Sequence, residues 1–219
     1  MKKRLMLPLL LIALSFVANV NAAPANVELD REKIPTDPAS VLRGAELVVN
    51  NCVSCHAIKY IKYTDMLALG VEQTTVDTWR GSNPMNARIL AQMPPEAAAA
   101  AFGGIVPTDL SLMTIARAGG VHYLYSYLTG YSVNDKGETI NRIFPGTRMP
   151  DVMGLSTTTD VKQRAEIVTK TKEITAFLNW AADPHAEERK TLGIYVIAYL
   201  LLLSVLLYLW KVQIWRKLD

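Results

Sequence analysis

Both cysteines of this 219-residue chain lie in one pentapeptide, Cys52-Val53-Ser54-Cys55-His56. Cysteines three positions apart fall on one face of a helical turn, and the histidine that follows projects from the same side. This spacing allows two thiols to add to the two vinyl groups of a haem while the imidazole binds its iron. The motif therefore predicts one covalently attached haem c, with His56 as an iron ligand.

Two other interpretations of the pentapeptide are weaker. A thioredoxin-like dithiol would lie in a βαβ unit, for which the sequence gives no signal. A structural zinc site would need four ligands, and only His122 and His185 remain to complete it. Covalent haem needs no residue outside the motif for its attachment and is the interpretation that we prefer.

A haem that transfers electrons usually has a second axial ligand, which is most often a neutral thioether or imidazole. Met149 is the strongest candidate because it lies in a proline-bounded loop, Phe144-Pro145-Gly146-Thr147-Arg148-Met149-Pro150. Such a loop can hold a side chain over the haem with little loss of entropy. Met153 is the nearest competitor, Met93 is the third candidate, and His122 would give bis-histidine ligation.

The N-terminus has the three-part pattern of a secretory signal peptide. Lys2, Lys3 and Arg4 precede an apolar stretch from Leu5 to Val17, and small residues follow up to Ala22. We predict a signal peptide over residues 1–22 and export of the mature domain, which in a bacterial cell means the periplasm.

A second apolar segment predicts a membrane anchor over residues 191–211. It contains no charged residue from Leu192 to Trp210. A helix of about 19 residues spans about 30 Å, the hydrocarbon thickness of a bilayer. Together with the signal peptide, the anchor predicts a single-pass protein of the bacterial inner membrane, with residues 23–190 in the periplasm and residues 212–219 in the cytoplasm.

The body between these segments is mildly acidic and predicted to be mostly α-helical. Residues 23–188 carry 15 Lys and Arg against 19 Asp and Glu, a net charge of −4, which gives nucleic-acid binding no electrostatic basis. Apolar periodicity and capping signals predict helices over 38–50 and 160–182, and the alanine run 97–101 predicts a helical turn. Many prolines and glycines between these helices indicate loops.

Six further segments of the chain form a recognisable series: Val41-Leu42-Arg43-Gly44-Ala45 before the pentapeptide, Pro107-Thr108-Asp109-Leu110-Ser111, residues 123–131, the Met149 loop, Trp180-Ala181-Ala182-Asp183-Pro184, and Glu188-Arg189-Lys190 before the anchor. These segments resemble cytochrome c1, and they occur in the same order as in that family. The family pattern at residues 123–131 is Tyr-x-x-Ser-Leu-Leu-Thr-Gly-Tyr. The resemblance covers almost the whole mature chain.

This resemblance implies a c-type cytochrome domain with loop insertions and one C-terminal transmembrane helix. It implies that Cys52 and Cys55 attach the haem, that His56 and Met149 bind its iron, that Arg117 lies near a haem propionate, and that Pro107 forms part of the crevice wall. Such a chain would be an electron-transfer subunit of ubiquinol–cytochrome c reductase, with no bond-making chemistry of its own.

The partners implied are cytochrome b, the Rieske iron–sulfur protein as electron donor and a cytochrome c as acceptor, in a complex that is dimeric as a whole. The alternative is an anchored monohaem cytochrome of another respiratory complex, such as a terminal oxidase or nitric-oxide reductase. The chain departs from the family pattern at Arg148, where many relatives have glycine, at Thr108, where the family has a second proline, and at residues 102–104.

Overall fold

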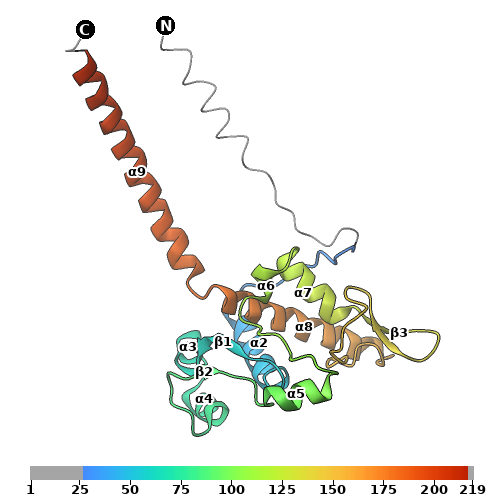
Figure 1. Cartoon of the computed structure of the whole chain (residues 1–219). Helices are drawn as coiled ribbons and strands as arrows, with labels where there is room; N and C mark the ends of the chain where they lie inside the picture. The colour runs from blue at the N-terminus through green and yellow to red at the C-terminus, as the bar shows by residue number, and fades with distance from the viewer. Residues whose placement is uncertain (1–26, 217–219) are drawn as a thin grey trace. The chain divides into compact units, whose positions relative to one another are not determined.

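The computed structural model describes residues 27–216, which form two units, one ending at Ala182 and one beginning at Asp183. The predicted signal peptide lies outside the described residues. The first unit is mostly helical (Figure 1), as predicted. Its helices are α2 (Pro38–Asn51), α3 (Tyr63–Leu69), α4 (Gln73–Arg80), α5 (Pro95–Ala101), α6 (Met113–Ala116), α7 (Gly120–Thr129) and α8 (Val161–Ala182).

Within residues 27–216, four short strands form two antiparallel pairs. β1 (Ile58–Lys62) pairs with β2 (Arg88–Ile89), and β3 (Tyr131–Val133) pairs with β4 (Thr139–Asn141). Strands of two to five residues are too short to show alternation in the sequence, which is why the sequence analysis predicted none of them.

Helix α2 begins where its sequence predicts. Asp37 is the N-cap residue, and its carboxylate accepts a hydrogen bond of 2.9 Å from the backbone N–H of Ser40. Pro38 occupies the first turn, where its missing N–H costs nothing. The predicted apolar residues Val41, Ala45 and Val48 are all buried.

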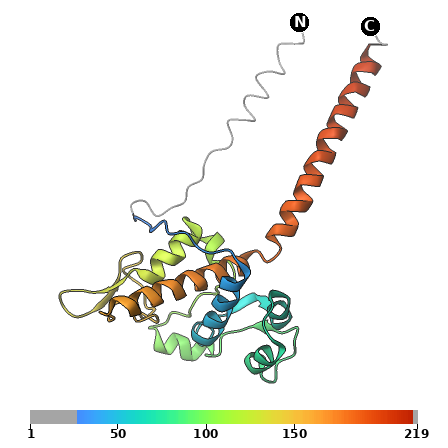
Figure 2. The same ribbon diagram turned by 180° about the vertical axis from the view of Figure 1, so that it is seen from behind.

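The main packing contact of the first unit is the crossing of α2 and α8, visible in both views (Figures 1 and 2). The two backbones meet at Gly44. A Cβ atom at this position would lie 2.0 Å from the carbonyl oxygen of Glu173 and 2.9 Å from the Cβ of Phe177. Only glycine allows this approach, so the glycine of the Val-Leu-Arg-Gly-Ala segment sets the distance between the helices.

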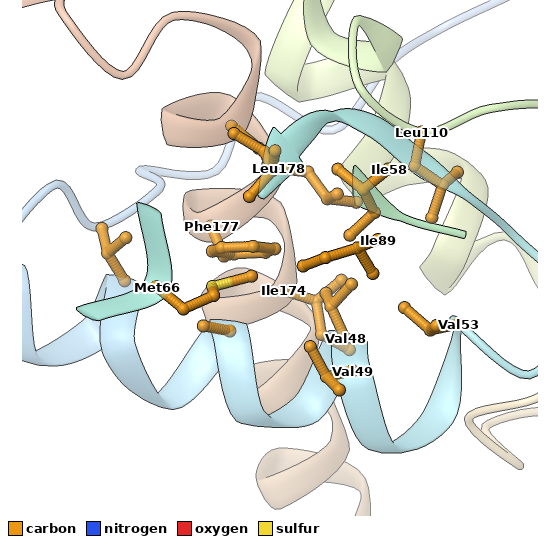
Figure 3. Close-up of a cluster of buried hydrophobic side chains, with 14 of the residues drawn as sticks. Val48, Val49, Val53, Ile58, Met66, Ile89, Leu110, Ile174, Phe177 and Leu178 are labelled. Atoms are coloured by element: carbon orange, nitrogen blue, oxygen red, sulfur yellow. The ribbon is translucent and has the colours of Figure 1, made fainter. Parts of the chain in front are cut away.

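The hydrophobic core surrounds this crossing (Figure 3). Figure 3 labels ten of its buried side chains, which come from α2, α3, α8, both strands of the first pair and the connecting loops: Val48, Val49, Val53, Ile58, Met66, Ile89, Leu110, Ile174, Phe177 and Leu178. Because Val53 lies inside the Cys-x-x-Cys-His motif and is 3% exposed, the motif is anchored directly to this core.

Helix α8 ends at Ala182, before Asp183-Pro184 as predicted. Its second half is buried more completely than its pattern indicates, whereas residues 161–166 are exposed. Thr171 and Thr175 are fully buried, although neither belongs to the predicted apolar face. Each hydroxyl donates a 2.8 Å hydrogen bond to the carbonyl four residues earlier, at Ile167 and Thr171. The helix thus satisfies these polar groups internally and can be covered on more than one side.

The second unit contains helix α9 (Ala186–Trp215), which includes the predicted anchor. Its most apolar 18-residue window has a mean hydropathy of 2.5, and none of that window is buried. Within residues 27–216, α9 is the one helix long and apolar enough to cross a bilayer. An unburied apolar helix of this length fits a single-pass membrane protein.

Candidate haem site

The Cys-x-x-Cys-His motif forms a tight turn at the end of α2. Cys52 is the C-cap residue, and its carbonyl accepts hydrogen bonds from the N–H groups of Cys55 (3.1 Å) and His56 (2.8 Å). Both thiols are free and half-buried. The turn holds the two cysteines and the histidine together through backbone bonds.

The Cys52 thiol has the wrong environment for a reactive dithiol. Burial, together with the neighbouring Cys55 thiol, raises the pKa of Cys52 to about 11. Redox-active cysteines have lowered pKa values, often because they lie at the N-terminus of a helix, whereas Cys52 lies at a helix C-terminus. The first unit also lacks a βαβ arrangement among its described residues.

The zinc interpretation gains no support from the geometry. Across the described part of the chain, no three His, Cys, Asp or Glu side chains come together as a possible metal site.

His56 is oriented by a backbone carbonyl. Its Nδ1 lies 2.7 Å from the carbonyl oxygen of Thr108. A carbonyl can only accept, so Nδ1 carries the proton and Nε2 keeps its lone pair free for a metal. Thr108 stands where the family pattern has a proline, but the hydrogen bond to His56 does not depend on this difference, because the acceptor is a backbone carbonyl.

Three further hydrogen bonds join the segment that follows His56 to the Pro-Thr-Asp-Leu-Ser segment. The N–H of Leu110 donates to the carbonyl of Ala57 (2.8 Å). The Asp109 carboxylate accepts a 3.1 Å bond from the N–H of Lys59, and the Ser111 hydroxyl accepts a 3.1 Å bond from the N–H of Tyr60. Two motifs about 50 residues apart thus form one bonded unit. Pro107, which precedes Thr108, is half-buried beside this unit.

The His56 ring is held in its neutral form. Burial lowers its pKa, and the opposing contributions of the Thr108 hydrogen bond and the Asp109 charge are smaller. Desolvation disfavours the charged imidazolium. A neutral imidazole with a free Nε2 is the form that binds iron.

The Met149 loop is fixed by hydroxyl groups. The backbone N–H of Met149 donates to Thr147 Oγ1 (3.2 Å), and its carbonyl accepts a 3.0 Å bond from the Tyr131 hydroxyl. The Met149 side chain is half-buried, and it packs against the same hydrophobic core as Cys52. The structure therefore brings the attachment turn and the Met149 loop to one core.

The alternative distal ligands occupy different places. Met153 is also half-buried against this core, so packing alone does not separate it from Met149. The backbone of Met93 is bonded to the attachment turn itself, through the carbonyl of Ser54 at 3.0 Å. His122 lies in the first turn of α7, and its Nδ1 is buried without a hydrogen-bond partner.

Arg117 is the predicted site residue that the structure connects least to the others. It is exposed at the C-terminal end of α6, and it forms none of the ion pairs found among the described residues. An unpaired guanidinium at this position remains available to an added carboxylate.

The similarity to known proteins extends over most of the chain. Residues 34–218 match the family described as Cytochrome C1. The chain belongs to the cytochrome c1 family. It is 29% identical to "Cytochrome c1" of Rhodospirillum rubrum, over 84% of this chain and 83% of that protein.

Eukaryotic relatives show the same breadth of similarity. The chain is 31% identical to "Cytochrome c1 2, heme protein, mitochondrial" of Arabidopsis thaliana, over 90% of this chain and 75% of that protein. It is 30% identical to "Cytochrome b-c1 complex catalytic subunit, mitochondrial" of Candida albicans, over 83% of this chain and 70% of that protein.

Membership of the cytochrome c1 family implies a haem cofactor, and the described residues fit one. Two free thiols lie next to an imidazole whose Nδ1 is already hydrogen-bonded, which leaves Nε2 free. Large apolar side chains are also exposed along the loops and short elements from 105 to 152: Ile105, Val106, Leu112, Ile115, Val133, Ile140, Phe144 and Val152.

Several residues that hold the site together were not predicted from the sequence. Asp109 and Ser111 were quoted only as part of a motif, although they fix the segment after His56. Tyr127 and Tyr131 received no role, although both are bonded around the Met149 loop. The order of the motifs was a signal that these segments belong to the site. It could not show which side chains bond to each other, because hydrogen bonds between distant segments leave no periodic pattern in one sequence.

Proposed function

We propose that this chain is the electron-transfer subunit of a quinol–cytochrome c reductase, in which its haem passes single electrons. The observation that carries the proposal is the family match over residues 34–218, which includes the attachment turn, the Met149 loop and the apolar helix α9 in one chain. The name of the Candida albicans relative, a b-c1 complex catalytic subunit, supports the same complex.

Four residues would hold the haem. Cys52 and Cys55 would form the thioether bonds, His56 Nε2 would be the proximal ligand and the Met149 thioether the distal ligand. When bound, the haem supplies a one-electron carrier whose potential a methionine ligand raises relative to histidine. Arg117 would pair with a haem propionate. Pro107 would stiffen the crevice wall next to Thr108.

The contribution of the protein is rigidity at both ligands. The Thr108 carbonyl fixes the His56 ring, and the bonds to Thr147 and Tyr131 fix the backbone of Met149. Ligands that stay in place in both redox states keep the rearrangement on electron transfer small. Because no general acid, base or nucleophile is required for this task, the chain would take part in an oxidoreductase without making or breaking bonds itself.

The membrane topology follows from the two ends of the chain. With the signal peptide removed near residue 22, residues 23–190 would lie in the periplasm of a bacterium. Helix α9 would cross the inner membrane once, and Lys211, Arg216 and Lys217 would lie on the cytoplasmic side. The haem would then remain near the membrane surface.

The partners follow from the complex. A Rieske iron–sulfur protein would donate the electron, and a cytochrome c would accept it. Cytochrome b would share the membrane with α9, and the whole complex would be a dimer. The alternative function, a cytochrome of a terminal oxidase or nitric-oxide reductase, is not favoured, because the family match and the relatives reported above are cytochrome c1 proteins.

A reduced-minus-oxidised spectrum of the tagged full chain, purified from its own membranes in mild detergent, tests the function. We expect a c-type band together with b-type bands, bleached by oxidant and restored by a quinol. A c-type band without cytochrome b would contradict the proposed complex, and a chain without haem would overturn the whole interpretation.

The distal ligand is tested by replacing Met149 with leucine, which preserves volume but cannot bind iron. We expect Met149→Leu to abolish the low-spin His/Met spectrum while covalent haem remains on a denaturing gel. Met153→Leu is the matched control from the same region, and Met93→Leu tests the third candidate. If the spectrum survives Met149→Leu and disappears in one of the other two variants, the assignment passes to that residue.

A further inference from the structure

The hydrogen bonds around Met149 form a closed ring through four residues. The N–H of Met149 donates to Thr147 Oγ1, which lies 2.6 Å from the Tyr127 hydroxyl. The Tyr127 and Tyr131 hydroxyl oxygens are 3.3 Å apart, and Tyr131 is bonded at 3.0 Å to the carbonyl of Met149. The ring therefore begins and ends on the same residue.

The Tyr131 hydroxyl donates both to the Tyr127 oxygen and to the Met149 carbonyl, so its one proton is shared between these two acceptors. Between Tyr127 and Thr147, either hydroxyl can be the donor. Hydrogen bonds that are linked in this way polarise and strengthen one another.

The position of the ring is set by regular structure and aromatic packing. Tyr127 lies on α7, and Tyr131 begins β3. Their rings form an edge-to-face pair with centroids 5.9 Å apart, and the ring of Tyr123 lies 6.4 Å from that of Tyr127. The Tyr127 carbonyl also accepts a 2.8 Å bond from the amide of Asn141. The hydroxyls thus project from a rigid support to a loop that has no regular structure of its own.

Tyr127 distinguishes this chain from the family pattern, which has leucine at the corresponding position of Tyr-x-x-Ser-Leu-Leu-Thr-Gly-Tyr. A leucine there would leave Thr147 and Tyr131 without the hydroxyl that connects them. The ring therefore depends on a tyrosine that the family pattern does not contain.

We propose that Tyr127 is a positioning residue that closes this ring and thereby holds Met149 on the haem iron. The inference rests on the proposed function, in which Met149 is the distal ligand. Tyr127 acts through Thr147 and Tyr131, which fix the two backbone groups of Met149.

Imidazole is a suitable probe, because it binds ferric haem only where Met149 has left the iron. Any rise in the population of the detached form therefore lowers the apparent Kd for imidazole by the same factor. Loss of one hydrogen bond corresponds to about a fivefold change in this population. We expect Tyr127→Phe in the purified holoprotein to lower the apparent Kd about fivefold, and Thr147→Val, which also removes the partner of the Met149 N–H, to lower it further.

Tyr125→Phe is the matched control. Tyr125 lies on the same helix and is buried, but none of the hydrogen bonds of the ring involves its hydroxyl. The variant Tyr125→Phe should leave the affinity for imidazole unchanged. Circular dichroism of each variant separates a local effect from a failure to fold, and Tyr127→Leu, which restores the family pattern, provides a second variant.

A double-mutant cycle distinguishes positioning from general destabilisation. In a Met149→Leu background no thioether competes with imidazole, so Tyr127→Phe should have no effect there. An equal effect in both backgrounds, or no effect of Tyr127→Phe in the native background, would overturn the inference. If Met149→Leu itself leaves the apparent Kd for imidazole unchanged, the ligand assignment in the proposed function fails instead.

Discussion

At the crossing of α2 and α8, side chains such as Val48 and Phe177 are completely excluded from water. Between Ile105 and Val152, by contrast, eight large apolar side chains remain exposed. The first region is held together by close packing of two long helices. The second consists of loops, short helices and a two-stranded sheet, and its order depends on specific hydrogen bonds.

The difference lies in how each region is stabilised. Burial of apolar area stabilises the crossing of the two helices. Between residues 105 and 152 some apolar side chains, such as Leu110 and Ile143, are buried, but others are exposed. Hydrogen bonds of the hydroxyl ring and of the segment around Thr108 therefore contribute more to holding the backbone of this region in place.

The strongest way to break the packed region is to add one methyl group at the crossing. In Gly44→Ala the new Cβ would lie 2.0 Å from the backbone carbonyl oxygen of Glu173, so the helices must move apart. Because a backbone atom cannot rotate away as a side chain can, we expect a loss of about 3 kcal/mol or more in the free energy of unfolding. The measurement is the denaturant midpoint of the detergent-solubilised chain.

Gly146→Ala is the control for this prediction, and it lies in the other region. A Cβ at Gly146 would have no neighbour within 4 Å. We expect little change, or a small gain because alanine restricts the unfolded chain. Similar destabilisation by both substitutions would show that the comparison between the two regions is wrong.

The loop region should respond most to the loss of a buried amide. Asn141 is 1% exposed, and its side-chain oxygen accepts bonds from the N–H groups of Ile143 (2.9 Å) and Phe144 (3.1 Å). Asn141→Ala leaves both donors without this partner, at a cost of about 2 kcal/mol. Hydrogen exchange should accelerate at these amides and in the Met149 loop, while α2 and α8 keep their protection.

Asn134→Ala is the matched control. Asn134 also holds a turn, through 3.0 Å and 2.9 Å bonds to the N–H groups of Lys136 and Glu138, but it does so at the exposed end of the hairpin. Water can replace its side chain there, so we expect a smaller effect, confined to the turn. Acceleration throughout α2 in the Asn141 variant would show that the two regions unfold together.

The two regions also differ in how well the sequence predicts them. Helices α2 and α8 were predicted nearly to the residue, because a cap at Asp37, apolar periodicity and the Asp183-Pro184 stop are local signals. The attachment turn was also predicted, because its chemistry lies in five consecutive residues. In each of these cases the residues that decide the structure are neighbours along the chain.

The rest depends on contacts between distant segments. The bond from His56 to Thr108 joins residues 52 positions apart, and it uses a backbone carbonyl that any residue type would supply. Tyr127 resembles an ordinary helix residue in the sequence, and its role arises only once β3 and the Met149 loop lie beside α7. A single sequence carries no record of such pairings, so the roles of Tyr127 and Thr147 could not have been predicted.

The smallest predicted effect concerns the beginning of α2. It tests whether a cap contributes to the stability of the packed region in addition to the helix crossing. The hydrogen bond from the Ser40 N–H lowers the pKa of Asp37 below its ordinary value. A carboxyl group with a lowered pKa in the folded state contributes stability above its unfolded pKa and loses it as the pH falls through the folded pKa. Asp37→Asn retains an N-cap acceptor but does not titrate.

We therefore expect the native chain to be slightly more stable than Asp37→Asn at neutral pH. This advantage should disappear on acidification, because the protonated carboxyl no longer interacts with the helix dipole as a charge. The two proteins differ only at this side chain, so the difference between their denaturant midpoints isolates the contribution of Asp37. A difference that stays constant with pH would mean that the cap acts only as a hydrogen-bond acceptor, and that packing at the crossing accounts for the stability of α2.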